Sequence, residues 1–480
     1  MMNLFYVTSE CAPFSKTGGL GDVLGALPKE MAKGPHDVRV VSPFYPRHMP
    51  EKYQDQLEDL VHFTIKVGWR EQYVGIKQLV MDQVTYYFID NLRYFDREGL
   101  YGYGDDAERF AYFSQAAIEM LEVIDFIPDI IHCNDWQTAM IPVLLKDKYA
   151  WKIRLRDIKT VLTIHNLLFQ GIFDQSVLSD LFGIGYDAFH EHGLKYYDKV
   201  NYLKGGIYYT DLVTTVSPTY AHEIQTPEFG CGLDQDLRNR SHHLVGITNG
   251  IDYDVFNPET DPALVKNYSK EDLSGKLVNK TALQERVGLP LDSDTALLGI
   301  VTRLDEQKGI QLLIDAMDEL MCHRRVQLIL LGTGKSYYEE AFRYFAAKYP
   351  DRFAGLIEFD VELAQLIYAG CDAFLMPSVF EPCGLSQLNA MRYGTLPIVH
   401  EVGGLADTVH PYHHDTAEGT GFSFHRFDVG TFLWVIDHAL TVYYDYPAQW
   451  HQLQMQAMSQ DNSWEKAAQN YLREYKYLAF

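Results

Sequence analysis

Short apolar runs alternate with amphipathic stretches along this chain, and the first of them define its fold class. Residues 4–7 form an apolar run, a turn-rich loop follows around Lys16 and Gly19, and apolar residues then recur at helical spacing from Val23 to Met31. Short β-rich runs indicate strands, and apolar residues every three or four positions indicate an amphipathic helix. The order strand, glycine-rich loop, helix is typical of an α/β fold.

The same alternation continues through the first half of the chain. Further strands are predicted at 38–43, 129–135, 159–166 and 211–217, with a helix at 136–146 after the second of them. Strands that alternate with helices predict a parallel sheet covered by helices on both faces.

A turn-rich, polar stretch at 244–260 interrupts the alternation, which then restarts. A helix is predicted from Ile310, and strands are predicted at 296–303, 326–334, 356–359, 372–378 and 396–400. We therefore expect two Rossmann-like, doubly wound domains, 1–245 and 246–455. Ligands of such sheets bind at the carboxyl ends of the strands, so an interdomain cleft is the expected site.

The last segment, 456–480, predicts a helix that packs back on the N-terminal domain. Trp464, Ala467, Ala468, Tyr471, Leu472 and Tyr475 share one helical face. Asn462 stands as a cap, with Glu465 three residues later.

Composition narrows the class of protein. A chain of 480 residues is too long to fold around a single hydrophobic core. Its composition, with 47% hydrophobic and 22% charged residues, excludes a disordered chain. The formal net charge of −24 disfavours binding to nucleic acid or to a membrane surface. The six cysteines are scattered without a CxxC pair, which favours reduced thiols. No apolar run is long enough to span a membrane, and an apolar run already starts at residue 4. We therefore expect a cytoplasmic protein without a targeting segment.

The loop KTGGLGD at 16–22 is the first candidate binding site. Lys16 and the backbone amides of Gly18 and Gly19 could receive a phosphate at the start of a helix, with Asp22 close by. The loop matches neither the GxGxxG nor the GxxxxGK[ST] pattern, so an ordinary strand-to-helix turn is the alternative.

Two cations follow a predicted strand in the second half. Arg303 ends the strand at 296–303, and Lys308 stands directly before Gly309 and a helix. Together they could clamp a diphosphate, since charge-assisted contacts are among the strongest hydrogen bonds. The alternative is a solvated arginine and a lysine that only flanks the helix.

Polar residues also follow the strands at 372–378 and 159–166. Glu381 lies between an aromatic residue and a proline, where it could face a sugar hydroxyl or a developing positive charge. Cys383 fits a small buried apolar residue better than a nucleophile. His165 and Asn166 end their strand, and a buried structural histidine is the alternative there.

Taken together, these motifs resemble those of the bacterial glycogen synthase and plant starch synthase family, in order, from about residue 2 to residue 480. The motifs are KTGGLGDV (16–23), HCNDWQT (132–138), TIHNLLFQGIF (163–173), TPEFGCGLD (226–234), ITNGIDYDVFNP (247–258), TRLDEQKG (302–309) and FEPCGLSQ (380–387).

The resemblance implies a retaining GT-B glucosyltransferase that passes glucose from ADP-glucose to the non-reducing end of an α-1,4-glucan such as glycogen, without a cofactor or a metal. It makes His165, Arg303, Lys308 and Glu381 the catalytic residues. On the same resemblance the donor is held by Lys16, Gly18, Gly19, Tyr101, Asn249, Cys383, Gly384 and Leu385. Asp22, Asp135 and Asn166 are assigned to the acceptor or sugar.

The sequence offers no evident covalent nucleophile, so we expect a front-face displacement through an oxocarbenium-like state. Three positions depart from the pattern implied by the resemblance. Asn389 stands where many retaining GT-B enzymes have a second glutamate, Gln137 stands where the bacterial family often has histidine, and Lys335 replaces an aspartate.

Three rival interpretations are weaker. A dehydrogenase needs the GxGxxG fingerprint, an α-glucan phosphorylase is larger and carries pyridoxal phosphate, and a silent glucan-binding regulator would not need the Lys16, Arg303, Lys308 and Glu381 set. The preference for ADP over UDP rests on the resemblance alone, and the sequence leaves the oligomeric state open.

Overall fold

A computed structural model describes residues 1–479 and divides them into two compact units. Unit 1 contains Met1–Gly250 and the chain from Trp464 onward, and unit 2 is Ile251–Ser463. The expected domain ends at 245 and 455 lie a few residues before these positions. No helix among the described residues is long and apolar enough to cross a membrane.

Unit 1 is built on a nine-stranded sheet. Its strands are β1 (Asn3–Val7), β2 (Asp37–Pro43), β3 (Glu58–Val67), β4 (Arg70–Met81), β5 (Val84–Asp90), β6 (Ile130–Asn134), β7 (Lys159–Ile164), β11 (Leu212–Thr215) and β12 (Leu244–Gly246), in the spatial order β12-β11-β7-β6-β1-β2-β5-β4-β3. A separate small sheet contains β8 (Ile172–Asp174), β10 (Lys199–Asn201) and β9 (Lys195–Tyr196).

The expectation of a purely parallel sheet is wrong at one edge of unit 1. β4 runs antiparallel to both β3 and β5, and these three strands had not been predicted. A tight turn at Gly68 and Trp69 joins β3 to β4, and Gly68 has a φ of +60°, which fits a turn that glycine adopts without strain. A hairpin of this kind adds edge strands without a crossover helix.

The helices of unit 1 are α1 (Gly19–Ala32), α2 (Glu51–Gln54), α3 (Leu92–Phe95), α4 (Asp106–Val123), α5 (Met140–Lys146), α6 (Tyr202–Tyr209), α7 (Pro218–Glu223), α8 (Asp234–Asn239) and α17 (Trp464–Ala479). The helix predicted at 136–146 begins only at Met140. Asp135 has a φ of +55°, and the Thr138 hydroxyl bonds the backbone of Asn134, so the chain turns before the helix starts.

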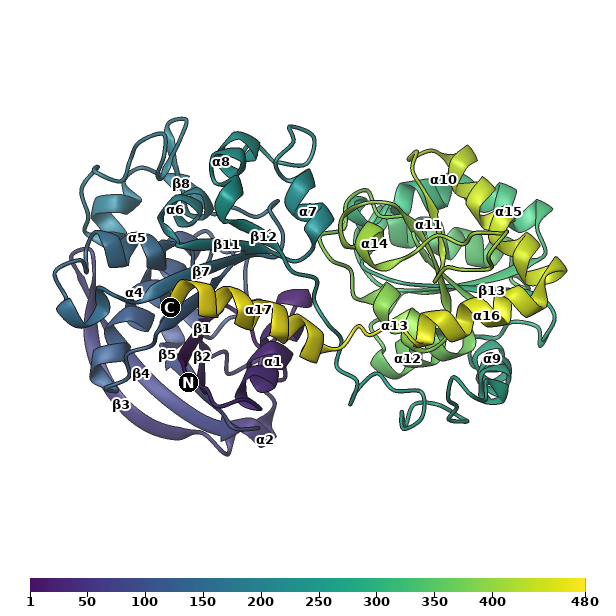
Figure 1. The fold of residues 1–480 in the computed structure, drawn as a ribbon, viewed down its shortest axis with the longest axis horizontal. Helices are drawn as coiled ribbons and strands as arrows, with labels where there is room; N and C mark the ends of the chain where they lie inside the picture. The colour runs from purple at the N-terminus through teal and green to yellow at the C-terminus, as the bar shows by residue number, and fades with distance from the viewer. Residues whose placement is uncertain (480) are drawn as a thin grey trace. The chain divides into compact units, whose positions relative to one another are not determined.

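The last helix, α17, packs on the rest of unit 1, where Figure 1 shows it in yellow beside α1. Tyr471 and Tyr475 are fully buried in the core with Val23 and Leu27 of α1. The Tyr475 hydroxyl lies 2.6 Å from Nδ1 of the buried His132. Burial lowers the pKa of His132 to about 3, so this ring is neutral. A cap at Asn462 would place the first helical residue at position 463. The helix begins at Trp464 instead, so the predicted cap lies one residue too early.

Unit 2 contains a six-stranded, fully parallel sheet in the order β15-β14-β13-β16-β17-β18. Its strands are β13 (Ala296–Val301), β14 (Val326–Leu331), β15 (Phe353–Leu356), β16 (Ala373–Met376), β17 (Leu396–His400) and β18 (Phe422–Phe424). Its helices are α9 (Ser274–Val287), α10 (Ile310–His323), α11 (Ser336–Lys348), α12 (Val361–Gly370), α13 (Ser386–Arg392), α14 (Gly403–Thr408), α15 (Val429–Asp445) and α16 (Pro447–Met458).

Both faces of this sheet are buried. Leu328 and Leu330 of β14 belong to one core cluster, and Ile329 and Leu331 belong to another. Successive side chains of a strand point to opposite faces, so helices cover the sheet on both sides. The strand predicted at 356–359 is misplaced along the chain. The observed strand β15 ends at Leu356, and Phe359 is 89% exposed.

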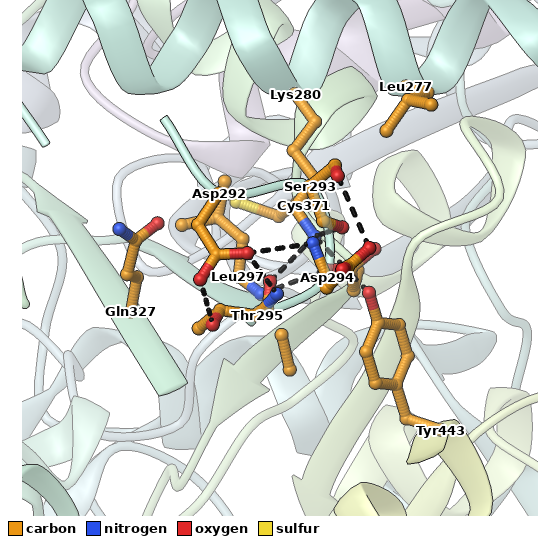
Figure 2. Close-up of polar contacts among 12 residues, drawn as sticks. Leu277, Lys280, Asp292, Ser293, Asp294, Thr295, Leu297, Gln327, Cys371 and Tyr443 are labelled. Carbon is orange, nitrogen blue, oxygen red and sulfur yellow. Dashed lines mark hydrogen bonds and ion pairs between the residues drawn. The ribbon is translucent and has the colours of Figure 1, made fainter. Parts of the chain in front are cut away.

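A buried lysine ties α9 to the amino ends of two sheet strands (Figure 2). Lys280 Nζ lies 2.8 Å from Asp372 Oδ2 and 2.7 Å from the Thr295 carbonyl oxygen. The same carboxylate oxygen accepts the Leu297 amide of β13 at 2.8 Å. Lys280 is only 2% exposed, so these partners replace the water that would otherwise solvate its ammonium group.

We predict that Lys280→Met destabilises unit 2, because it leaves the Asp372 carboxylate without its cation in a buried setting. The expected loss is about 3 kcal/mol, seen as a lower urea midpoint. Lys348→Met is the matched control, since its partner Asp318 is an exposed surface carboxylate and the expected change is below about 1 kcal/mol. Equal midpoints for the two variants would contradict the prediction.

Candidate active site

The glycine-rich loop of unit 1 is organised around a carboxylate that the sequence analysis missed. Glu10 is 3% exposed and accepts the Thr17 amide at 2.6 Å and the Gly18 amide at 3.3 Å. Its other oxygen accepts the Tyr101 hydroxyl at 2.8 Å. The Gly18 amide, expected to face a phosphate, thus points to Glu10 in this structure. An acidic residue three positions after a predicted strand, at the start of the loop, is the signal that could have identified it.

Lys16 and Asp22, assigned to different parts of the substrate, form an ion pair here. Lys16 Nζ lies 2.6 Å from Asp22 Oδ1, with 49% and 38% of the two side chains exposed. Burial raises the pKa of Asp22, and the charge of Lys16 partly offsets that effect. Because about half of the Lys16 side chain is exposed, Lys16 can exchange this partner for an anion at modest cost.

His165 lies at the carboxyl end of β7 beside β6. Its Nε2 lies 2.9 Å from Asn134 Oδ1. The amide nitrogen of Asn134 donates to the carbonyls of Val7 and His132, which fixes the amide orientation and makes Oδ1 the acceptor. The proton of His165 is therefore on Nε2, and Nδ1 carries the lone pair. Burial lowers the pKa of His165 to about 3, so the ring is neutral.

Asp135 and Asn166 flank this histidine. Asp135 Oδ1 accepts the His165 amide at 2.7 Å. Burial raises the pKa of Asp135 to about 7, although the backbone amides of His165 and Asn166 oppose the shift. Asn166 Oδ1 accepts the Leu168 amide at 3.0 Å in a local turn. The carboxyl ends of β6 and β7 thus bring together a neutral imidazole and a carboxyl group that titrates near neutrality.

Two amide oxygens of unit 1 are buried without a partner. Asn249 is 6% exposed and Gln137 is 7% exposed, and within residues 1–479 neither Asn249 Oδ1 nor Gln137 Oε1 has a hydrogen-bond partner. Buried polar atoms are nearly always bonded, so an unpartnered acceptor points to a group from outside the chain.

In unit 2 the structure brings Lys308 and Glu381 together. Lys308 Nζ lies 2.7 Å from Glu381 Oε2, and Ser378, which the sequence analysis did not single out, donates its hydroxyl to the same oxygen at 2.9 Å. Both residues follow neighbouring parallel strands, β13 and β16, so their loops meet at one edge of the sheet.

Gly309 allows this meeting. Its φ is +68°, and a Cβ there would stand 1.7 Å from the Pro377 carbonyl oxygen. No side chain fits, so a glycine is required for the loop after β13 to approach the loop after β16. The Val379 amide donates to the Gln307 carbonyl at 2.8 Å and joins the two loops further.

Arg303 lies two residues beyond β13, and the predicted strand was too long at this end. It is 62% exposed, and Nη2 lies 3.6 Å from Asp305 Oδ2. Unlike Lys308, it is therefore only loosely held and can reorient toward an anion.

The remaining candidates of unit 2 lie just before and within α13. Gly384 has a φ of +70°, Leu385 precedes the helix, and Cys383 is 5% exposed. Gln387 donates to the Cys383 carbonyl at 3.0 Å and the Gly384 carbonyl at 2.9 Å and so fixes this turn. Asn389 is 6% exposed, and its Oδ1 has no hydrogen-bond partner within residues 1–479.

Family models match both units. Residues 3–239 match the starch synthase catalytic domain, and residues 283–452 match glycosyl transferases group 1. Among solved structures, the catalytic domain of starch synthase IV from Arabidopsis thaliana, bound to ADP and acarbose, is similar with a TM-score of 0.92 and 35% identity, over 100% of this chain and 99% of that one. Sucrose-phosphate synthase from Thermosynechococcus elongatus, at 17% identity and a TM-score of 0.62, shares the fold.

Curated relatives match along the whole chain. The glycogen synthase of Streptococcus sanguinis (strain SK36) is 56% identical over 470 residues, which are 98% of each chain. The glycogen synthase of Streptococcus mutans serotype c is 54% identical over 478 residues, with full coverage of both chains. The chain therefore belongs to the glycogen synthase and starch synthase family and is a glucosyltransferase with the two-domain GT-B fold.

Proposed function

We propose that this chain transfers glucose from ADP-glucose to the non-reducing end of an α-1,4-glucan, with retention at the anomeric carbon. The observation that carries the proposal is the meeting of Lys308 and Glu381 at the carboxyl ends of adjacent parallel strands, with an exposed cation, Arg303, close in sequence. A cation and a carboxylate in one place can serve the two parts of a sugar nucleotide, the diphosphate and the sugar.

In this proposal the unit 2 residues act on the donor. Lys308 and Arg303 neutralise the diphosphate as it leaves, a charge that grows in the transition state and is therefore better stabilised there than in the ground state. Glu381 faces the donor glucose. Its bonds to Lys308 and Ser378 both fall on Oε2, so Oε1 is the oxygen offered to a sugar hydroxyl. Cys383, Gly384 and Leu385 contribute the backbone turn around the donor.

The unit 1 residues complete the donor and acceptor contacts. His165 is held neutral, with its proton toward Asn134, so it presents no second positive charge to an oxocarbenium-like centre. Lys16 leaves Asp22 for the diphosphate, while Gly19 and Tyr101 contact the donor. Asn249 Oδ1 accepts a donor hydroxyl, which would satisfy its unpaired oxygen. Asp22, Asp135 and Asn166 bind the acceptor or sugar.

We propose a front-face displacement for the chemical step. The bond between the anomeric carbon and the diphosphate oxygen breaks, and the acceptor hydroxyl oxygen bonds the same face of that carbon. The hydroxyl proton passes to the departing phosphate oxygen, so ADP leaves with the electron pair of the broken bond. Proximity of the two groups supplies a large share of the acceleration. A trapped covalent glucosyl-enzyme would overturn this step.

The partners follow from the same proposal. The glucan is neutral, so the net charge of −24 does not hinder its binding, and the anionic donor meets local cations instead. The six cysteines are thiols and not disulfides, which fits work in the reducing cytoplasm.

The donor nucleotide is tested by comparing ADP-glucose with UDP-glucose on glycogen. We expect release of the nucleoside diphosphate, with kcat/KM at least about tenfold higher for ADP-glucose. Turnover with neither donor would overturn the proposed function and favour a glucan-binding regulator. Equal turnover would overturn the ADP preference only.

We expect Lys308→Gln to lower kcat by about 100-fold or more while glycogen binding is unchanged, because the substitution removes charge that stabilises the leaving diphosphate. Lys335→Gln is the control: Lys335 also carries a cation, but it pairs with Glu306 and is 51% exposed. It should keep the rate of the wild type. A Lys308→Gln variant with wild-type kcat would refute the assignment.

Asp135→Asn should separate stability from activity. Burial raises the folded-state pKa to about 7, above the unfolded value of about 4, so the ionised carboxylate is penalised in the folded protein. That penalty is absent below about pH 4 and complete above about pH 7. We therefore expect the variant to melt at a higher temperature than wild type at pH 8, with the difference shrinking toward pH 4, and to have a lower kcat. A lower melting temperature at pH 8 would contradict this.

A further inference from the structure

His400 is a buried polar residue that the proposed reaction does not yet use. It is the last residue of β17, beside β16, and is 7% exposed. Its ring lies against Phe424 and Phe427, with ring centroids 5.1 and 5.2 Å away. A ring at the carboxyl end of a central strand, packed on two aromatic side chains, is fixed in one orientation.

Its two nitrogens face backbone carbonyls. Nδ1 lies 2.7 Å from the Ser378 oxygen, and Nε2 lies 3.2 Å from the His425 oxygen. A carbonyl oxygen only accepts, so the shorter contact assigns an N–H to Nδ1. His400 therefore holds the backbone of Ser378, in the loop that follows β16.

That backbone carries the side chain that orients Glu381. The Ser378 hydroxyl donates to Glu381 Oε2 at 2.9 Å, and the same oxygen receives Lys308 Nζ at 2.7 Å. The Gly404 amide of α14 bonds the Glu381 carbonyl at 3.0 Å. The segment from β17 to α14 thus holds this loop at two points, one before and one at Glu381.

We propose that His400 is a positioning residue for glucosyl transfer, acting through the Ser378 carbonyl to set the Ser378 hydroxyl and, through it, the Glu381 carboxylate. The inference rests on the proposed function, because Glu381 is taken to face the donor sugar. A displaced carboxylate would act on the sugar at the wrong angle, and small misplacements of this kind are costly in rate.

Two substitutions separate the contacts of the ring. At position 400, the side-chain amide nitrogen of an asparagine can stand where the histidine has Nδ1. The side-chain amide nitrogen of a glutamine can stand where the histidine has Nε2. We expect His400→Asn to keep kcat within about threefold of wild type, because it can still donate to Ser378. We expect His400→Gln to lower kcat about 10- to 100-fold, with KM for glycogen unchanged. Loss of ring packing alone would affect both variants equally, and that result would overturn the inference.

The route through Ser378 is tested by a double-mutant cycle. Ser378→Ala should lower kcat about as much as His400→Gln, and the double variant should lie within about twofold of the slower single variant. If the loss of kcat in the double variant equals the product of the two single losses, the proposed route through Ser378 is overturned. If His400→Gln does not fold, Ser378→Ala at wild-type kcat would equally overturn the inference.

The baseline is wild-type turnover of ADP-glucose with glycogen. Its absence would overturn the proposed function and this inference with it, whereas wild-type turnover together with an unimpaired His400→Gln variant would overturn the inference alone.

Discussion

Parallel pairing of β13 with β16 is the constraint on which the unit 2 site depends. Parallel strands end at the same edge of a sheet, so the loops that leave them are neighbours whatever their separation in sequence. Lys308 and Glu381 are 73 positions apart, and their charges meet at 2.7 Å because of this pairing. Gly309 then allows the two backbones to approach more closely than any side chain would permit.

Charges in both units are buried only where they have partners. Lys280 and Asp372 tie α9 to the amino ends of β13 and β16, at the end of the sheet opposite Lys308 and Glu381. In unit 1, Glu10 is surrounded by donors from the glycine-rich loop and from Tyr101. A buried charge without a partner is expensive, so such clusters fix the loops in one arrangement. Some neutral buried groups do lack a partner: the amide oxygens of Gln137, Asn249 and Asn389 are among the buried polar atoms without a hydrogen bond within residues 1–479, and they lie at positions of proposed or questioned ligand contact.

Some parts of the fold could be predicted and others could not. The strands at 38–43 and 396–400 were placed within a residue, because β-branched and apolar runs between turn signals are a local property. The hairpin of β3 and β4 was missed, since an edge strand buries only part of one face and lacks a continuous apolar run. Phe359 was predicted to lie in a strand and is exposed instead, because residues 353–356 satisfy the pairing with β14.

The sequence by itself determined the family and the alternation of strands and helices, and it predicted the residue types of the candidate site, because motifs and periodicity are carried by neighbours along the chain. Only the tertiary structure decided which of these residues touch. It paired Lys16 with Asp22 and turned the Gly18 amide to Glu10. It also placed the Ser378 hydroxyl on Glu381 and the His400 ring on the Ser378 carbonyl. Such contacts depend on strand order and on burial, and both are set by packing among segments far apart in the chain.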